Sequence, residues 1–315
     1  MTPIRFPDSD LLSSLRGEVD SRLRMLLCRC DNRTPAALVD AMRHATLAGG
    51  KRLRALLLLG IVEALRGDRH NGLSAAAAVE MIHAASLIVD DLPCMDNASN
   101  RRGRVVLHRQ IGEAATILTA FALINLAFEV LTTMRDVPAS TIVRLQGELA
   151  GAVGRTGLVA GQWDDLDLSQ ARVAHTSIAL SKTGALFAFA ARCGGVLCGA
   201  GPEDTRRLAR FGRLFGLGYQ MLDDVCDGES RHGQLVAVRR VLDNARASAR
   251  GTAWQGVADA FVRPAEEFSR AHEQQEDRNG KPGKATGRRS TDHIKGTSGG
   301  NRIEPAALTG IDVLP

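Results

Sequence analysis

Apolar residues recur at spacings of three and four along most of this 315-residue chain, which is the periodicity of helices that bury one face. Leu11–Leu27 shows this pattern among charged residues, whereas Ala75–Val89 and His108–Met134 are apolar almost throughout. Alternation with a period of two, which marks strands, is nearly absent. The pattern therefore predicts an all-α fold in which the most apolar segments are buried helices.

The same periodicity predicts further helices and locates their ends. We expect these helices over residues 34–48, 145–162, 176–193 and 235–268. Gly184, Gly251 and Pro264 should interrupt them, because glycine and proline are unfavourable inside a helix. From Ala271 onward, Gly, Ser, Thr and charged residues replace the apolar ones, which is typical of disorder. We expect a helical domain over residues 1–270 and a disordered, atypical tail over residues 271–315.

Composition agrees with a globular helical protein. The apolar fraction is 44% and the charged fraction is 24%, while aromatic residues make up only 4%. The net charge is +5, but acidic residues lie among the basic ones along the whole chain. Nucleic-acid binding needs a concentrated basic surface, so it is disfavoured here. A small anionic molecule is the better-matched partner.

Cysteine use and hydropathy indicate a cytoplasmic protein without a membrane span. The six cysteines form no Cys-x-x-Cys pair and mostly have apolar neighbours, which is typical of reduced, buried thiols. The first twenty residues lack the apolar core of a secretory signal. The longest apolar runs, Ala55–Val62 and Thr116–Leu131, are too short or interrupted to cross a bilayer.

Met81–Arg104 changes along its length from apolar to acidic and then to basic. Pro93 should end the helix shortly after Asp90, and the resulting bulge should bring Asp96 back beside Asp90. His83 lies two turns before Asp90 and so shares its face, although a lone histidine is more often a core residue. The segment resembles the rim of a hydrophobic cavity for a ligand with an apolar body and an anionic head. Its charged residues are Asp90, Asp91, Asp96, Arg101, Arg102 and Arg104.

A second acidic cluster ends the apolar segment Phe211–Asp227. Asp223 and Asp227 are four residues apart and share a helical face, with Asp224 beside them and Gln220 one turn earlier. Like charges this close are unfavourable unless cations lie between them. Because the ligands are all oxygens, the two clusters predict Mg²⁺ rather than Zn²⁺. A third acidic group, Asp164, Asp165 and Asp167, is interpreted mainly as a helix end and loop.

Two basic segments are candidate anion sites. Gly49–Arg54 places Lys51 and Arg54 one turn apart at a helix start, where they could clamp a phosphate; a solvated basic turn is the alternative. Lys182 and Thr183 precede a mid-helix glycine, and a helix break there would expose backbone groups to a ligand.

The order and spacing of these motifs resemble the trans-isoprenyl diphosphate synthases of the polyprenyl synthetase family. DDLPCMD at Asp90–Asp96 resembles the first aspartate-rich motif of that family, and GYQMLDDVCD at Gly218–Asp227 resembles the second. GGKRLR and KTGALF occur at the matching places, so the resemblance covers about residues 10–227. It implies a homodimeric, all-α isoprenoid-synthase helical bundle around a central hydrophobic cavity.

The resemblance implies a Mg²⁺-dependent prenyltransferase that condenses isopentenyl diphosphate with an allylic diphosphate (dimethylallyl, geranyl or farnesyl). Metal binding is implied for Asp90, Asp96 and Asp223, supported by Asp91, Asp224 and Asp227. Isopentenyl diphosphate binding is implied for Lys51, Arg54, His83 and Arg102. Allylic diphosphate contacts are implied for Arg101, Lys182, Thr183 and Gln220. The released diphosphate is the expected proton acceptor, so no side-chain nucleophile is needed.

Product length should depend on Ala85 and Ser86, which precede Asp90 by five and four residues. An aromatic ring there would form a floor, as in many farnesyl diphosphate synthases; two small residues let the chain grow. With the two extra residues inside the first motif, the chain looks like bacterial geranylgeranyl diphosphate synthases. A twenty-carbon product is predicted for terpenoid biosynthesis, and Ala85→Phe is expected to shorten it.

The chain departs from the family after the second motif. The family supplies lysines there, but Gly228–Gln234 contains none, and a faint echo appears only at Glu276–Thr286 with Lys281 and Lys284. Three alternatives stay open: a farnesyl diphosphate synthase, a class I terpene cyclase, and a degenerate homologue that binds prenyl diphosphates without condensing them. GGKRLR together with Arg102 argues against a cyclase, since a cyclase needs no second diphosphate site.

Overall fold

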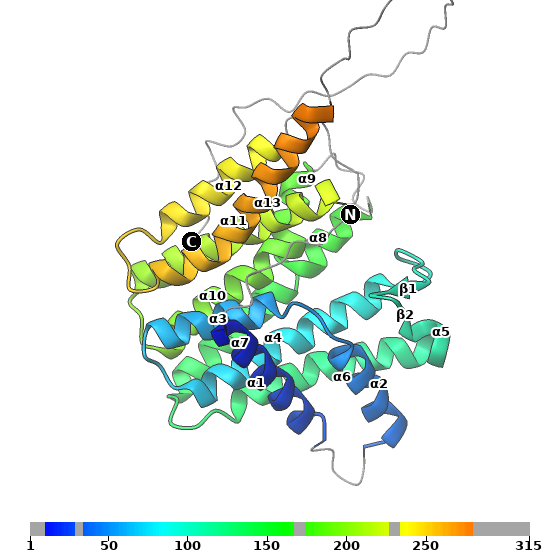
Figure 1. The fold of residues 1–315 in the computed structure, drawn as a ribbon. Coiled ribbons are helices and arrows are strands. Elements are labelled where there is room, and N and C mark those ends of the chain that lie inside the picture. The colour runs from blue at the N-terminus through cyan, green and yellow to red at the C-terminus, as the bar shows by residue number, and fades with distance from the viewer. Residues whose placement is uncertain (1–9, 29–33, 167–173, 227–233, 280–315) are drawn as a thin grey trace, which may run out of the picture. The chain divides into compact units, whose positions relative to one another are not determined.

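The structure is a computed structural model that describes residues 10–28, 34–166, 174–226 and 234–279 (Figure 1). The first part of the chain forms α1 (Asp10–Leu26), α2 (Ala36–Leu47), α3 (Leu53–Ala64), α4 (Arg69–Asp90), α5 (Leu107–Ile111), α6 (Glu113–Thr132) and α7 (Ala139–Val153). The second part forms α8 (Leu158–Asp165), α9 (His175–Ala179), the π-helical turn η1 (Leu180–Gly184), α10 (Ala185–Leu197), α11 (Pro202–Cys226), α12 (Gln234–Ser248) and α13 (Gln255–Asn279). The predicted all-α class is confirmed.

Internal contacts divide the chain into Met1–Arg270 and Ala271–Pro315. α13 continues to Asn279, past the point where composition placed the start of the tail. Glu, Gln and Arg are frequent in its last turns and favour helix even without apolar neighbours. Residues 280–315, with Lys281 and Lys284, lie outside the described part of the chain.

α4 is the central helix of the larger unit. It packs against α3 and α6 and also contacts α1, α2 and α10. The run Ala75–Ala78 is completely buried, and its small side chains let neighbouring helices approach closely. α4 therefore fixes the position of everything at its carboxyl end, where the acidic segment begins.

α10 and α11 form the second half of the core, and glycines let their backbones meet. A Cβ on Gly212 would lie 2.3 Å from the carbonyl oxygen of Phe187, so only glycine fits. A cluster of aromatic residues packs beside this contact. Phe215 is the centre of this group, with the ring of Phe187 at 5.3 Å and that of Phe261, from α13, at 5.5 Å. These rings attach α13 to α11.

The breaks between helices differ in detail from those expected. Gly112, at φ 84°, separates α5 from α6. The Lys182–Gly184 region is a π-helical turn and not a full break. Pro264, expected to interrupt a helix, lies inside α13. Buried Phe261 and Ala265 on either side hold that helix to the core, which offsets the hydrogen bond that proline removes.

A small hairpin follows α4 and was not predicted. β1 (Asn100–Arg101) pairs antiparallel with β2 (Arg104–Val105). Arg102 and Gly103 form its tip and both have positive φ, at 53° and 75°, as a tight type I′ turn requires. The hairpin therefore carries Arg101, Arg102 and Arg104, the basic residues at the end of the Met81–Arg104 segment.

Among the described residues, two helices, α4 and α6, are long and apolar enough to cross a membrane by length and composition alone. The sequence expectation, which rested on shorter uninterrupted apolar runs, had excluded such helices. Of the apolar window of α4, 72% is buried inside the protein, so α4 is a core helix. The corresponding share of α6 is 39%, so α6 keeps an apolar face outside this core. Neither value shows a membrane span.

The glycine contact between α10 and α11 gives a stability prediction. Gly212→Ala should lower the free energy of unfolding by about 1–3 kcal/mol, because backbone atoms must move apart. Gly147→Ala is the matched control, because this helical glycine in α7 has nothing within 4 Å of an added Cβ. This variant should have a free energy of unfolding up to about 1 kcal/mol higher than the wild type. Thermal denaturation followed by circular dichroism measures both. Equal midpoints for the two variants would contradict the close packing described.

Candidate functional site

An open cavity of about 900 Å³ lies between α3, α4, η1 and α11. Its wall contains most of the charged and polar residues singled out in the sequence. These are Lys51, Arg54, His83, Ser86, Asp90, Asp96, Arg101, Arg102, Lys182, Thr183, Gln220, Asp223 and Asp224. Residues up to 173 positions apart in the chain, Lys51 and Asp224, therefore share one cavity.

The first acidic motif folds back as predicted. α4 ends at Asp90, and the chain turns before Pro93. The backbone N–H of Asp96 then donates to the carbonyl oxygen of Asp90 at 2.9 Å. Asp90 and Asp96 consequently sit together on the cavity wall, on the segment that leaves α4.

The second acidic motif is held by a relay of side-chain hydrogen bonds. The hydroxyl of Thr183, in η1, donates to the amide oxygen of Gln220 at 3.0 Å. The amide nitrogen of Gln220 donates to Asp224 Oδ1 at 2.9 Å. This relay ties the π-helical turn to the last turns of α11, which carry Asp223 and Asp224. Asp227 lies outside the described residues.

The donor set fits Mg²⁺ completed by a substrate. In the described part of the chain, no three His, Cys, Asp or Glu side chains form a ready-made metal cage. Mg²⁺ is commonly held by one or two carboxylates together with substrate phosphates, so a preformed cage is not required. Burial, with a further contribution from Asp96, raises the pKa of Asp90 to about 6, while Lys182 opposes the shift. A cation beside Asp90 would relieve this desolvated negative charge.

Two acidic residues are paired with cations within the protein. Asp91 was grouped with the metal ligands, but it is buried off the cavity wall and pairs with Arg101, 2.7 Å from its Nε. Asp165 ends α8, as the helix-end interpretation of its segment predicts, and lies on the cavity wall 2.6 Å from Lys182 Nζ. Each carboxylate thus holds a cation that the sequence linked to the allylic diphosphate.

The remaining cations form a separate group near the start of α3. Lys51 Nζ donates to the hydroxyl of Tyr219 at 2.9 Å. The Arg54 guanidinium lies over the ring of Phe187, 4.4 Å from its centre, and its buried Nε has no hydrogen-bond partner in the part of the chain that the structure describes. Arg102, at the tip of the hairpin, donates to the carbonyl oxygen of Gly49. These cations are placed to receive an anion.

His83 is a neutral member of this group. Burial lowers its pKa well below the usual value of 6.5, and the charges of Arg54 and Arg102 lower it further. The imidazole is therefore uncharged at neutral pH. It can donate one hydrogen bond and accept another, but it adds no positive charge.

Of the two residues expected to set product length, the structure places only Ser86 on the cavity wall. Its hydroxyl donates to the carbonyl oxygen of His83 at 2.9 Å, which directs the polar atom back to the helix. Ala85 is 1% exposed and belongs to the packed core.

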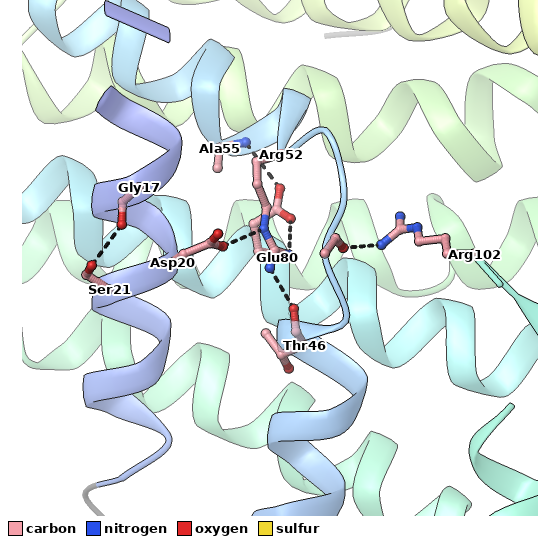
Figure 2. A network of polar contacts seen from close by, with 9 residues as sticks. Gly17, Asp20, Ser21, Thr46, Arg52, Ala55, Glu80 and Arg102 are labelled. Carbon is pink, nitrogen blue, oxygen red and sulfur yellow. Dashed lines mark hydrogen bonds and ion pairs between the residues drawn. The ribbon is translucent and has the colours of Figure 1, made fainter. Parts of the chain in front are cut away.

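Sequence reasoning also missed two residues beside the cations. Arg52, within the GGKRLR segment, is buried and contacts Glu80, Asp20 and the end of α2 (Figure 2). Glu80 is an isolated acid in the apolar stretch of α4, and such a residue needs a buried partner. That requirement is the signal in the sequence that Glu80 has a buried cationic partner.

The model of the polyprenyl synthetase family matches residues 35–235. Among the curated relatives, geranylgeranyl pyrophosphate synthase 3 of Arabidopsis thaliana is 42% identical over 205 residues, covering 62% of this chain and 56% of that protein. Geranylgeranyl pyrophosphate synthase 12 of the same plant is 43% identical over 203 residues, covering 61% and 56%. Both names carry the word chloroplastic. The chain spans about half the length of these relatives.

Solved structures match over more of the chain. An FPP/GFPP synthase from Zymomonas mobilis is 29% identical with a TM-score of 0.73, covering 83% of this chain and 97% of that one. A geranyltransferase from Legionella pneumophila is 27% identical with a TM-score of 0.74, covering 84% and 97%. Together with the family-model match over residues 35–235, these likenesses show that the chain belongs to the polyprenyl synthetase family.

Proposed function

We propose that the chain is a Mg²⁺-dependent prenyltransferase that condenses isopentenyl diphosphate with an allylic diphosphate. One observation carries the proposal: cations from the α2–α3 loop and α3, from the hairpin and from η1 line the same cavity as two pairs of carboxylates. This many cations suit two diphosphates, and the carboxylates suit the metal that accompanies one of them. The names of the relatives support the same chemistry.

Lys51, Arg54 and Arg102 would bind the diphosphate of isopentenyl diphosphate, with His83 as a neutral hydrogen-bonding group. Lys182, Thr183, Gln220 and Arg101 would bind the allylic diphosphate. Asp90, Asp96, Asp223 and Asp224 would hold Mg²⁺, and Asp227 stays a predicted ligand. Bound Mg²⁺ neutralises the diphosphate that leaves. We assign Asp91 to orienting Arg101, since the two are paired in the structure.

In this reaction the carbon–oxygen bond of the allylic diphosphate breaks and leaves an allylic cation. The double bond of isopentenyl diphosphate forms the new carbon–carbon bond, and a proton is lost to the released diphosphate. Lys182 stabilises negative charge on the leaving group, and Asp165 keeps its ammonium group at the cavity. Apolar wall residues, among them Leu87, Ile178 and Leu186, restrict water around the cation.

We favour geranylgeranyl diphosphate as the product. Small Ser86 on the cavity wall and the names of the curated relatives support a twenty-carbon chain. A farnesyl product is the alternative, which the name of the Zymomonas mobilis neighbour supports. The other alternative is a non-catalytic homologue. Two features support it: the family match ends at residue 235, and Gly228–Gln234 contains no lysine.

We also propose that the chain forms a homodimer through α6. Leu118 and Phe121 are 63% and 60% exposed and lie three residues apart, on one face of this apolar helix. Monomeric proteins rarely leave such a face in water, so a second copy is a suitable cover. Cytoplasmic localisation stays a prediction, because the names of the plant relatives place those proteins in chloroplasts.

The activity itself is tested with purified protein, Mg²⁺, isopentenyl diphosphate and each of dimethylallyl, geranyl and farnesyl diphosphate. We expect a twenty-carbon product, no product with excess chelator, and a kcat at least about a hundredfold lower in Asp223→Asn. Chromatography of the dephosphorylated products measures chain length. Elongation of none of the three primers would overturn the proposal in favour of a non-catalytic homologue, and a fifteen-carbon end product would favour the farnesyl alternative.

Product length is tested by placing one aromatic ring at two neighbouring positions. Ser86→Phe should shorten the main product, because this side chain is on the cavity wall. Ala85→Phe puts the same ring into the packed core and should mainly lower the thermal midpoint, by overpacking worth about 1–3 kcal/mol. An unchanged product from Ser86→Phe would refute the length assignment, and shortening by Ala85→Phe alone would return it to that residue.

The dimer is tested by sedimentation at micromolar concentration. The wild type should sediment at twice the chain mass of 33.7 kDa, and Phe121→Asp should sediment as a monomer, since a buried unpaired charge opposes association. Val236→Asp is the control, because this exposed apolar residue lies on α12. A monomeric wild type, or a Phe121→Asp variant that stays dimeric, would rule out this interface.

A further inference from the structure

The loop that joins α2 to α3 has an unusual backbone. Gly49 and Gly50 have φ of 88° and 142°, and Arg52 has φ of 52°. A side chain in the left-handed region costs about 1–2 kcal/mol, so Arg52 needs contacts that hold it there. The part of this loop from Gly49 to Arg52 also carries Lys51, and Arg54 follows it in the first turn of α3.

Arg52 is held by contacts to three other elements (Figure 2). Its Nε donates to Asp20 of α1 at 3.0 Å, and one terminal nitrogen donates to Glu80 of α4 at 3.1 Å. The other terminal nitrogen donates to the carbonyl oxygen of Thr46 in α2 at 2.7 Å. All three guanidinium nitrogens are therefore engaged by protein oxygens, and the side chain is only 4% exposed. Although Arg52 forms part of the cavity wall, it has no nitrogen left without a protein partner.

Glu80 connects this contact to the start of α3. Its second carboxylate oxygen accepts the backbone N–H of Ala55 at 3.4 Å, so one buried acid binds both Arg52 and the first turn of the helix. The residue at the N-cap, Arg52 itself, makes no side-chain cap hydrogen bond. A carboxylate at this place satisfies a free backbone N–H and is favoured by the helix dipole.

The orientation of the Arg52 side chain is linked to the orientations of Lys51 and Arg54. Because its side chain turns into the core, Lys51 and Arg54 are left on the cavity wall. On the other side of the loop, Arg102 holds the carbonyl oxygen of Gly49. The loop is thus fixed from the core by Arg52 and from the hairpin by Arg102. The charge of Glu80 also opposes the effects of burial and of the Arg102 charge on the pKa of Arg54.

We infer that Arg52, clasped by Glu80 and Asp20, is a positioning residue that sets the loop Gly49–Arg52 so that Lys51 and Arg54 bind the diphosphate of isopentenyl diphosphate. The inference rests on the proposed function and names a device within that site. It makes Arg52 act through its neighbours and not by touching the substrate. Three of the proposed allylic diphosphate contacts, Lys182, Thr183 and Gln220, lie on η1 and α11, and the fourth, Arg101, is held by Asp91 and not by this loop.

The expected effect is a selective change in KM. Glu80→Gln weakens the clasp, and should raise the KM for isopentenyl diphosphate about tenfold with little change in the KM for the allylic substrate. It should also lower the thermal midpoint, because the guanidinium loses its buried counter-charge. Glu266→Gln is the matched control: this buried acid pairs with Arg246, away from the cavity wall, and should lower the midpoint without changing either KM.

A double variant separates positioning from stability. Arg52→Met with Glu80→Leu removes both buried charges. Asp20 also loses its partner, but its side chain is 28% exposed and can be hydrated, so much of the thermal stability should return. If the pair only stabilises the fold, the KM for isopentenyl diphosphate returns with it. A positioning role predicts that this KM stays about tenfold high, because nothing then holds the loop.

Calorimetric titration of isopentenyl diphosphate, without an allylic primer, gives a readout independent of turnover. The inference is supported if the wild type binds isopentenyl diphosphate and the affinity is about tenfold lower in Glu80→Gln and in the double variant. Equal affinity in the wild type and both variants overturns the inference. So does an equal loss of affinity for both substrates that parallels the fall in thermal midpoint. Either result leaves the proposed function intact. A folded wild type that neither binds nor condenses isopentenyl diphosphate removes the proposed function, and this inference with it.

Discussion

Burying charge without a counter-charge is unfavourable, and this constraint organises the cavity. Some of its charged groups are paired within the protein: Arg101 with Asp91, Lys182 with Asp165, and Arg52 with Glu80. Others are left for a ligand. The Nε of Arg54 has no hydrogen-bond partner among the described residues, and Asp90 has a raised pKa because it is desolvated. The internal pairs hold the scaffold and aim the binding groups, and the unmatched groups define what can bind.

The fold supplies this arrangement by ending helices at the cavity. α4 ends at Asp90, α3 begins beside Lys51, and α11 carries Asp223 in its last turns. The π-helical turn η1 is tied to α11 through Thr183 and Gln220. Elements that are far apart in the chain therefore bring short polar segments to one place, while their apolar bodies form the core.

Local chemistry predicted much of the site. Pro93 cannot continue α4, and the resulting turn brings Asp96 onto Asp90; one-turn spacing likewise put Lys51 and Arg54 on a common wall. Partners set by tertiary packing were not predictable in this way. Neither the contact of Arg52 with Glu80, 28 residues away, nor that of Lys182 with Asp165, 17 residues away, follows from helical periodicity. Helix propensity alone also predicts an interruption at Pro264, but packing around this residue keeps α13 continuous.

The central claim is that one cavity binds two diphosphates in two different ways. A crystal structure with Mg²⁺, isopentenyl diphosphate and a thio-analogue of farnesyl diphosphate tests it most directly. We expect one diphosphate on Lys51, Arg54 and Arg102, and a second joined through metal to Asp90 and Asp223 beside Lys182. A single diphosphate in the cavity, or two diphosphates with no metal at the aspartates, would contradict it.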